Sequence, residues 1–352
     1  MHCMLLSVAL PLAAFAAEPL YELSGRVPVE GRISVSLFGA TTPFSEFTWA
    51  DGNGNFSFKK LRPGAYTVGV FVPVLGEARQ TIEIGPGTAD RRRRVFLDLR
   101  LKASDFVPDA LRRHAVSTRQ LAIPDKARRD YEDAQKDLAK HEVDSAIARL
   151  QRAVEVAPQF AAAWNNLGTI AYQTQKFDRA EEYFRKALEQ EPEAYEPLVN
   201  LGGVLVTVHR LDDALDYNIR AVLTRGNDAL ANAQLGQTYF QIGNFDLALK
   251  YLERARQLDP SHFSHPQLFL AEIHLRRGER RAASADLEDF LSHHPDWPQA
   301  VKMRETIAEL RSLTSVRPAV GFPRPFFSVF PPHPPCLRRT QGLRQLLTII
   351  LV

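Results

Sequence analysis

Amide and aromatic side chains recur at a fixed interval in the second half of the chain, and these residue types suit recognition of a peptide. Asn166, Asn200 and Gln234 are spaced by 34 residues, and Tyr172 and Phe240 lie a few residues further along their own segments. An amide group donates and accepts hydrogen bonds, as a peptide backbone requires, and aromatic rings supply apolar anchors. The same amides could instead bond between neighbouring helices, and this alternative stays open.

A wider stripe follows from the same spacing. Offsets 2, 5, 9, 12 and 13 within each repeating unit share one face of a helix at 3.6 residues per turn. The predicted groove combines this stripe with the amide column: Tyr131, Gln135, Asn165, Asn166, Thr169, Tyr172, Asn200, Gln234, Gln237, Phe240, Gln241, Glu272 and Arg276. Only Arg276 is basic, so a clamp of lysines and arginines on a C-terminal carboxylate is disfavoured.

The sequence contains none of the common catalytic motifs that were considered. The sequence lacks H-E-x-x-H, G-x-S-x-G, a phosphate loop and a G-x-G-x-x-G after a strand, which predicts a protein that is not an enzyme and needs no cofactor. His262, His265, His293 and His294 fall in loops of adjacent units, where imidazoles could bind zinc adventitiously. Solvated histidines are the favoured interpretation, because no carboxylate partners are evident.

The elements that would position the groove are predicted by a 34-residue period between residues 127 and 297. Small or helix-ending residues occupy its columns: Ala146, Ala180, Ala214 and Ala248; Ala153, Ala187, Ala221 and Ala255; Gly168, Gly202 and Gly236; Pro158, Pro192 and Pro260, with Gly226 at the missing proline. Independent columns in register predict stacked pairs of helices, with small residues at the crossings and prolines at the turns.

The second unit shows Trp164-x-x-Leu167-Gly168, then Tyr172, Ala180, Phe184, Ala187 and Pro192, and it resembles the tetratricopeptide repeat family closely. The resemblance implies a superhelical all-α solenoid whose concave side binds peptides, often through the asparagine column. Five repeats are predicted, followed by a capping helix: 127–160, 161–194, 195–228, 229–262, 264–297 and 298–313. Asn218 at an apolar column and Gly226 suggest local loosening.

Residues 19–102 show apolar alternation of period two, which predicts strands of an all-β sandwich. The alternating faces are Ile33, Val35 and Leu37; Phe56 and Phe58; Tyr66, Val68 and Val70; Val95, Leu97, Leu99 and Leu101. Asp51-Gly-Asn-Gly-Asn55 predicts a hairpin turn. With Phe56-x-Phe58 and Leu61-x-Pro63-Gly64-x-Tyr66, the stretch resembles the carboxypeptidase-regulatory-like and transthyretin-like β-sandwich family, which implies a non-catalytic accessory module often found in exported proteins.

Two polar features of this part favour structural roles. Asp51 and Asn53 offer too few oxygens for calcium, which takes six to eight oxygen ligands. The run Arg91–Arg94 is interpreted as a solvated hairpin tip that blocks edge pairing, with an anion-binding patch as the alternative.

The ends of the chain differ from both patterns. Met4–Ala17 is almost continuously apolar and ends in Ala14-Phe15-Ala16, which predicts a signal peptide over residues 1–16 and export to the periplasm or the cell exterior. A cytoplasmic protein with a misassigned start is the alternative. Residues 103–124 are predicted to be a linker, and the proline-rich residues 314–352 are predicted to be disordered.

The amino-acid composition limits the classes of partner that this protein could bind. Hydrophobic residues make up 45% and charged residues 24%, as in ordinary globular proteins. The repeat segment is mildly acidic, which argues against nucleic acid. The sequence therefore predicts a non-enzymatic exported scaffold that binds a protein or peptide, with peripheral association with the envelope left open and the oligomeric state undetermined. The alternative is binding of glycans or surfaces through the β-sandwich.

Overall fold

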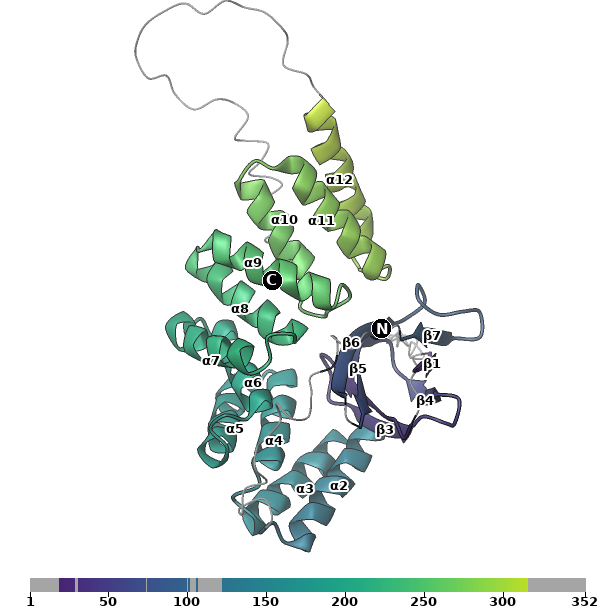
Figure 1. The fold of residues 1–352 in the computed structure, drawn as a ribbon, viewed down its shortest axis with the longest axis vertical. Helices are drawn as coiled ribbons and strands as arrows, with labels where there is room; N and C mark the ends of the chain where they lie inside the picture. The colour runs from purple at the N-terminus through teal and green to yellow at the C-terminus, as the bar shows by residue number, and fades with distance from the viewer. Residues whose placement is uncertain are drawn as a thin grey trace, which may run out of the picture.

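The computed structural model describes residues 19–28, 31–73, 75–99, 101, 106 and 122–315, and within them seven strands precede eleven helices (Figure 1). The strands are β1 (Tyr21–Arg26), β2 (Ser34–Gly39), β3 (Ser45–Trp49), β4 (Asn55–Leu61), β5 (Gly64–Val72), β6 (Gly76–Ile84) and β7 (Arg94–Asp98). The helices are α2 (Asp125–Ala139), α3 (Val143–Val156), α4 (Ala161–Gln173), α5 (Phe177–Gln190), α6 (Tyr195–Thr207), α7 (Leu211–Thr224), α8 (Ala229–Ile242), α9 (Phe245–Leu258), α10 (Pro266–Arg276), α11 (Arg280–His293) and α12 (Ala300–Ser315).

The strands form two sheets that enclose one apolar core. One sheet has the order β4-β1-β7 and the other β3-β2-β5-β6. In the second sheet Val35 lies opposite Val70 and Leu37 opposite Val68, and all four are buried. The predicted alternation thus lines the core, and the all-β sandwich is confirmed. The predicted signal peptide, most of the linker and nearly all of the tail lie outside the described residues.

The Asp51–Asn55 turn corrects one expectation. The Asp51 carboxylate accepts hydrogen bonds from the backbone N–H groups of Asn53 and Asn55, each at 2.8 Å, and Gly54 has a φ of +80° that suits glycine. However, β3 and β4 belong to different sheets, so the turn connects the two layers and the prediction of a hairpin within one sheet is wrong. The sequence encoded the turn geometry but not which strands would pair.

Helix pairs stack in chain order and form the predicted all-α solenoid (Figure 1). The period-34 alanines of both columns are fully buried. A Cβ on Gly168 would lie 2.5 Å from the Phe184 ring, and a Cβ on Gly236 would lie 2.7 Å from the Leu252 side chain. Glycine therefore permits the two helices of a repeat to approach closely, which is why it recurs.

The last helix, α12, packs on the final repeat. Met303, Ile307 and Leu310 are buried in one cluster with Phe290 of α11 and Leu268 of α10. This covering of the open end is what a solenoid requires. Within the part of the chain that the structure describes, no helix is both long and apolar enough to span a bilayer.

The β-sandwich lies on the concave side of the arc of helices, with β3 beside α2 and β6 toward the later repeats (Figure 1). Contacts between the two parts join residues more than a hundred positions apart in the sequence. The concave face is therefore shared between the solenoid and the chain's own sheet.

Candidate ligand-binding cavity

The strand β6 and the loop after it anchor the sandwich on the solenoid. The Thr81 backbone N–H donates to the Asp259 carboxylate at 2.8 Å, and the Gly87 N–H lies 2.8 and 2.9 Å from the two Asp296 carboxylate oxygens. Asp259 follows α9 and Asp296 precedes α12. The two carboxylates accept hydrogen bonds from backbone N–H groups that have no partner in the sheet. These bonds therefore fix the distance between the sheet and the helices.

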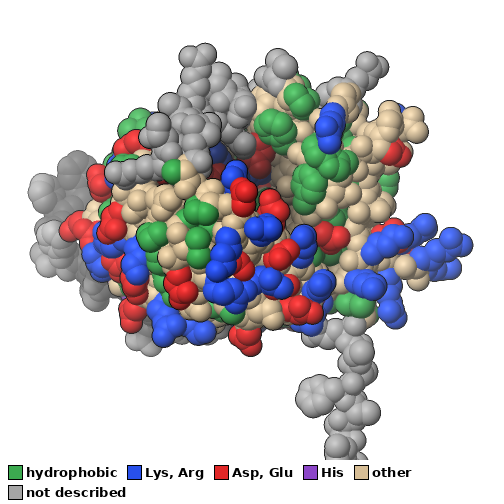
Figure 2. All heavy atoms as spheres, turned by 90° about the horizontal axis from the view of Figure 1, so that it is seen from below, with side chains coloured by type: hydrophobic (Ala, Val, Ile, Leu, Met, Phe, Trp, Pro, Cys, Tyr) green, Lys and Arg blue, Asp and Glu red, His purple; other side chains and the backbone are tan. Residues whose placement is uncertain are grey.

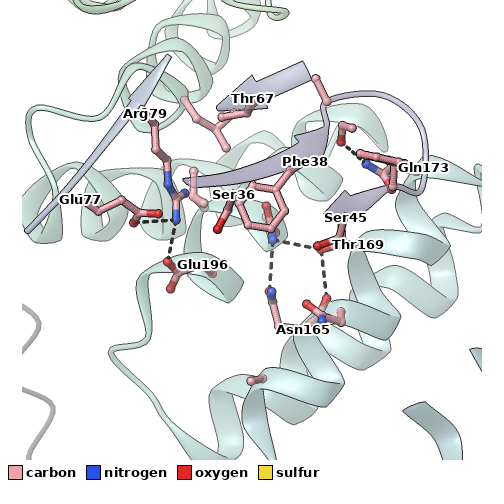
Figure 3. Close-up of a pocket in the computed structure, with 18 of the residues that line it drawn as sticks. Ser36, Phe38, Ser45, Thr67, Glu77, Arg79, Asn165, Thr169, Gln173 and Glu196 are labelled. Atoms are coloured by element: carbon pink, nitrogen blue, oxygen red, sulfur yellow. Dashed lines mark hydrogen bonds and ion pairs between the residues drawn. The ribbon is translucent and has the colours of Figure 1, made fainter. Parts of the chain in front are cut away.

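A second anchor is ionic. Arg79 of β6 lies 3.2 Å from Glu77 and 3.3 Å from Glu196 of α6, and Arg225 lies 3.1 Å from the same Glu196 carboxylate. The Arg225 guanidinium also stacks 4.0 Å from the Tyr195 ring centroid. Figure 3 shows the Glu77–Arg79–Glu196 set at one end of a cavity. This network bridges the sheet and the third repeat.

Between these anchors and α2 lies a cavity of about 910 Å³. One wall is the outer face of the sheet, where Ser36 and Phe38 of β2 and Phe47 of β3 point away from the sandwich core. The opposite wall is made by the first helices of the first repeats and includes Asn165 and Asn200. Phe38 faces the amide wall across the cavity (Figure 3). The volume of the cavity falls within the range of about 300–1,000 Å³ that ligand sites in proteins occupy.

Hydrogen bonds order the amide wall. Asn200 Nδ2 donates to Asn165 Oδ1 at 3.1 Å, which links α6 to α4, and Thr169 Oγ1 donates to the Asn165 carbonyl at 3.1 Å. Gln173 Nε2 donates to the Gly39 carbonyl at 3.0 Å and ties the same wall to the sheet (Figure 3). The inter-helix role of the amides is thus realised for one pair, while both members still face the cavity.

Tyr131 closes the cavity at the first repeat. Burial raises the pKa of its hydroxyl, and side-chain hydrogen bonds with Asn166 and Gln135 act in the opposite direction. Its ring packs against Phe160 with centroids 4.9 Å apart. The tyrosine is therefore held in place by neighbours on α2 and α4, and it presents a neutral hydroxyl.

The structure brings part of the predicted groove together. The predicted residues that line the cavity are Tyr131, Gln135, Asn165, Asn166, Thr169 and Asn200. The remaining predicted residues do not line it: Tyr172, Gln234, Gln237, Phe240, Gln241, Glu272 and Arg276.

Local contacts occupy several of the residues outside the cavity. Phe240 packs against Phe245 and Phe269, and the Arg276 guanidinium, paired with Glu272 at 2.6 Å, lies 5.6 Å from the Phe240 ring centroid. Gln237 donates to the Ser264 carbonyl at 3.2 Å. These residues form a separate stretch of the stripe at the later repeats.

Sequence reasoning missed the sheet wall. Phe38 and Phe47 are 38% and 53% exposed although they sit in strands of a sandwich. Aromatic residues at the outward positions of alternating strands were the available signal, because such positions are ordinarily polar.

The histidines contradict the prediction that they are solvated. His262 and His294 are buried, and the rings of His265 and His294 lie 4.7 Å apart beside Phe290 and Trp297. Burial lowers the pKa of His262, and burial with the neighbouring imidazoles lowers the pKa of His265 to about 3. Among the described residues, no group of three or more metal-ligating side chains is arranged to hold a metal ion.

Comparison with known proteins agrees with the geometry of the helical part. Models of the tetratricopeptide repeat match residues 131–196 and residues 229–262. The human cell division cycle protein 16 homolog is 28% identical over 113 residues, which cover 30% of this chain and 18% of that protein. The Drosophila melanogaster BBSome complex member BBS4 homolog is 25% identical over 120 residues, 34% of this chain and 25% of that protein.

A solved structure of MamA from Desulfovibrio magneticus RS-1 is 19% identical and aligns with a TM-score of 0.45 over 50% of this chain and 99% of that one. In contrast, the matched segment spans only a quarter or less of the length of the two curated relatives named above. The relation of the β-sandwich to carboxypeptidase-regulatory-like domains stays a prediction. Both family models fall inside the helical arc, so the helix pairs within residues 131–196 and 229–262 are similar to tetratricopeptide repeats.

Proposed function

We propose that this chain is a non-enzymatic scaffold that binds an extended segment of a protein or peptide in the cavity between its repeats and its own sheet. Tetratricopeptide-repeat proteins generally mediate protein–protein interactions, which supports a binding role over a catalytic one. The cavity refines the predicted groove, since the partner would contact only the part of the stripe near the first three repeats.

The observation that carries the proposal is the pairing of two unlike walls. Amides on the helix wall donate and accept hydrogen bonds with a peptide backbone, while Phe38 and Phe47 on the sheet wall offer apolar contact to its side chains. A segment held between the walls would satisfy both kinds of group.

Site-directed photo-crosslinking tests this proposal. With p-benzoylphenylalanine in place of Phe38, we expect covalent capture of one partner segment in the native host. The same photoreactive residue in place of Phe96, which is 68% exposed on the other sheet, should not capture it. Equal capture at both positions would contradict the proposal.

Paired variants separate the cavity from the rest of the predicted stripe. Asn165→Ala with Asn200→Ala should reduce partner recovery about ten-fold or more, because each amide lost leaves backbone groups of the ligand without a partner. Tyr172→Ala with Phe240→Ala should retain binding, since both residues lie outside the cavity. The reverse pattern would move the binding site to the later repeats.

The predicted signal sequence implies that this scaffold acts outside the cytoplasm. We propose that cleavage after Ala16 leaves Ala17 as the first residue of the mature protein. Mass spectrometry of the N-terminal peptide from the native host tests this. An intact N-terminus beginning at Met1 would favour the cytoplasmic alternative.

A second candidate function rests on an exposed aromatic pair on β3. Phe47 and Trp49 are 53% and 48% exposed with ring centroids 5.2 Å apart, and the Arg32 guanidinium lies 4.3 Å from the Trp49 ring. Aromatic faces beside a cation suit the flat faces of sugars. A glycan array probed with the whole chain and with Trp49→Ala tests it, and loss of specific glycan signals in the variant would favour this function.

A further inference from the structure

One end of the sheet β4-β1-β7 gathers cations from two strands. Arg94, the first residue of β7, lies opposite Glu22 of β1. On the other side of β1 the register shifts, so that Lys59 and Lys60 of β4 both fall opposite Glu22 in a bulge, and Lys60 has a φ of +59°. The strand pairing therefore brings lysines and arginines that are far apart in the sequence to the same end of this sheet.

The turn before β7 is ordered by its own carboxylate. Asp90 accepts hydrogen bonds from the backbone N–H groups of Arg92 and Arg94 at 2.8 and 2.9 Å, and it pairs with the Arg94 guanidinium at 2.9 Å. Arg94 is thus neutralised. Arg91, Arg92 and Arg93 are exposed on this hydrogen-bonded turn, so that their charges are held together at a defined place.

We call this region the basic end and define it by five exposed cations and two apolar side chains: Lys59, Lys60, Arg91, Arg92, Arg93, Leu20 and Phe96. Within the part of the chain that the structure describes, none of the five cations forms an ion pair. Glu22 and Asp90 lie beside them, and Asp90 is already paired with Arg94. The basic end therefore carries a net positive charge, which attracts anions.

The two apolar side chains of the basic end are unusually accessible. Phe96 is 68% exposed and Leu20 is 47% exposed. Phe96 lies on the outer face of the sheet beside Ser24, because Val95 and Leu97 on either side of it are buried in the core. Large apolar groups next to cations suit the boundary between the headgroups and the acyl chains of a bilayer.

The basic end lies on the side of the sandwich away from the helices (Figure 1). The other sheet, β3-β2-β5-β6, faces the repeats and lines the cavity. A flat surface could therefore contact the basic end while the cavity stays accessible to a partner.

We infer that the basic end docks this protein on an anionic lipid bilayer. The five cations contact the headgroup phosphates, and Phe96 and Leu20 enter the headgroup region beside them. A soluble polyanion would satisfy the cations and leave both apolar side chains in water, which is why a lipid surface is the better fit. This surface lies outside the cavity, so its role is independent of the proposed peptide binding.

Sedimentation of the whole protein with lipid vesicles tests the inference. We expect binding to vesicles made of equal parts phosphatidylcholine and phosphatidylglycerol, and little binding to vesicles of phosphatidylcholine alone. Binding should weaken at about 0.5 M salt, because screening shortens the reach of the surface potential to a few ångströms.

Matched charge variants locate the effect. Arg91→Gln with Arg92→Gln and Arg93→Gln should lower partitioning onto the anionic vesicles about 100-fold, as expected for three arginines near a charged surface. Arg179→Gln with Lys302→Gln and Arg304→Gln removes the same charge from exposed positions on α5 and α12. This control should bind nearly as the wild type does, and circular dichroism should show both variants folded.

The aromatic side chain distinguishes a bilayer from a soluble phosphate. Phe96→Ser should lower partitioning about ten-fold, through the loss of a buried apolar side chain. In Phe96→Trp, brominated phosphatidylglycerol should quench more of the tryptophan fluorescence than in the wild type. Soluble glycerol phosphate, which carries the same headgroup chemistry, should not displace the protein from vesicles.

Three results would overturn the inference. They are equal binding to neutral and anionic vesicles, equal loss in the two charge variants, and displacement by glycerol phosphate without added quenching in Phe96→Trp. The Asn165→Ala with Asn200→Ala variant should sediment with vesicles as the wild type does. Failure of peptide binding and failure of lipid docking are therefore distinguishable.

Discussion

At the residue scale, Asn218 stands where the other repeats have a large apolar side chain. It is fully buried, its Nδ2 donates to Thr238 Oγ1 at 2.9 Å, and its side chain lies directly over Gly202. The sequence suggested local loosening at this column. The structure instead keeps the repeat geometry and fills the site with a hydrogen-bonded amide, which places a buried polar group between α6 and α8.

Gly202→Ala should destabilise the third repeat. A Cβ there would lie 2.0 Å from Asn218 Oδ1, so the buried amide would have to move and break its hydrogen bond. We expect a loss of about 1–3 kcal/mol in the free energy of unfolding. Urea denaturation measures it, with Gly52→Ala as the control, since no atom lies within 4 Å of a Cβ at that turn position. Equal midpoints for the two variants would contradict the argument.

His265 should make the last repeat sensitive to acid. Its folded pKa of about 3 lies below the unfolded value of 6.5, because burial and the imidazoles of His294 and His262 disfavour the charged form. Such a group contributes stability above pH 6.5 and loses it as the pH falls toward 3. Asp259 and Glu83 face the same cluster from the α9 end and from β6, and they oppose the effect only in part.

The test compares melting temperatures of the wild type and His265→Asn at about pH 7.5 and about pH 5. Asparagine tolerates the left-handed backbone at this position, where φ is +52°. The wild type should lose more stability on acidification than the variant. An equal loss would assign the acid sensitivity to other groups.

At the element scale, β6 is an edge strand that the solenoid protects. Edge strands expose unpaired N–H groups that promote aggregation, and proteins cover them. Here Asp259 accepts from the Thr81 N–H, and Asp296 accepts from the Gly87 N–H in the following loop. A Cβ on Gly87 would lie 2.6 Å from the Asp296 carboxylate, so glycine permits this approach.

Asp296→Ala should release the loop after β6. We expect the Gly87 amide to exchange hydrogen about ten-fold faster, the equivalent of one lost hydrogen bond to a charged group. Hydrogen-exchange mass spectrometry over residues 85–89 measures the change. Asp246→Ala removes an exposed carboxylate that pairs with Arg277 in the solenoid and should leave this exchange unaltered. Acceleration in both variants would show that the effect is not local.

At the scale of the whole molecule, the sheet and the arc of repeats are joined by contacts between distant parts of the chain. Lys and Arg side chains mix with Asp and Glu across the middle of the lower face instead of forming a patch of one sign (Figure 2). The proposed binding site is therefore the cavity between the sheet and the repeats, not this face. The carboxylates at Asp259, Asp296 and Glu196 keep the two walls at the separation that creates it.

Combined replacement of these three carboxylates by alanine should detach the sandwich while each part stays folded. Small-angle X-ray scattering should show a larger radius of gyration than in the wild type, and circular dichroism should be unchanged. Peptide binding should fall with it, because the sheet wall moves away from the amides. An unchanged radius of gyration would mean that apolar contacts alone hold the two parts together.

The sequence by itself determined the elements of this protein. Period two in residues 19–102 marked the sandwich core, and period 34 marked the helix pairs, because close helix crossings admit only alanine or glycine. The helix wall of the site followed in part from the same period, as Asn165 and Asn200 show.

Only the tertiary structure decided how much of the predicted stripe faces a cavity and that Phe38, Phe47 and Arg79 belong to the site. The contacts responsible join residues 117, 178 and 209 positions apart. A single N–H and a single carboxylate that meet when two folded parts dock leave no periodic trace in the sequence, since each occurs once and either residue is ordinary in its own element. Periodicity reports repeated burial within an element, whereas docking depends on the shapes of two finished surfaces.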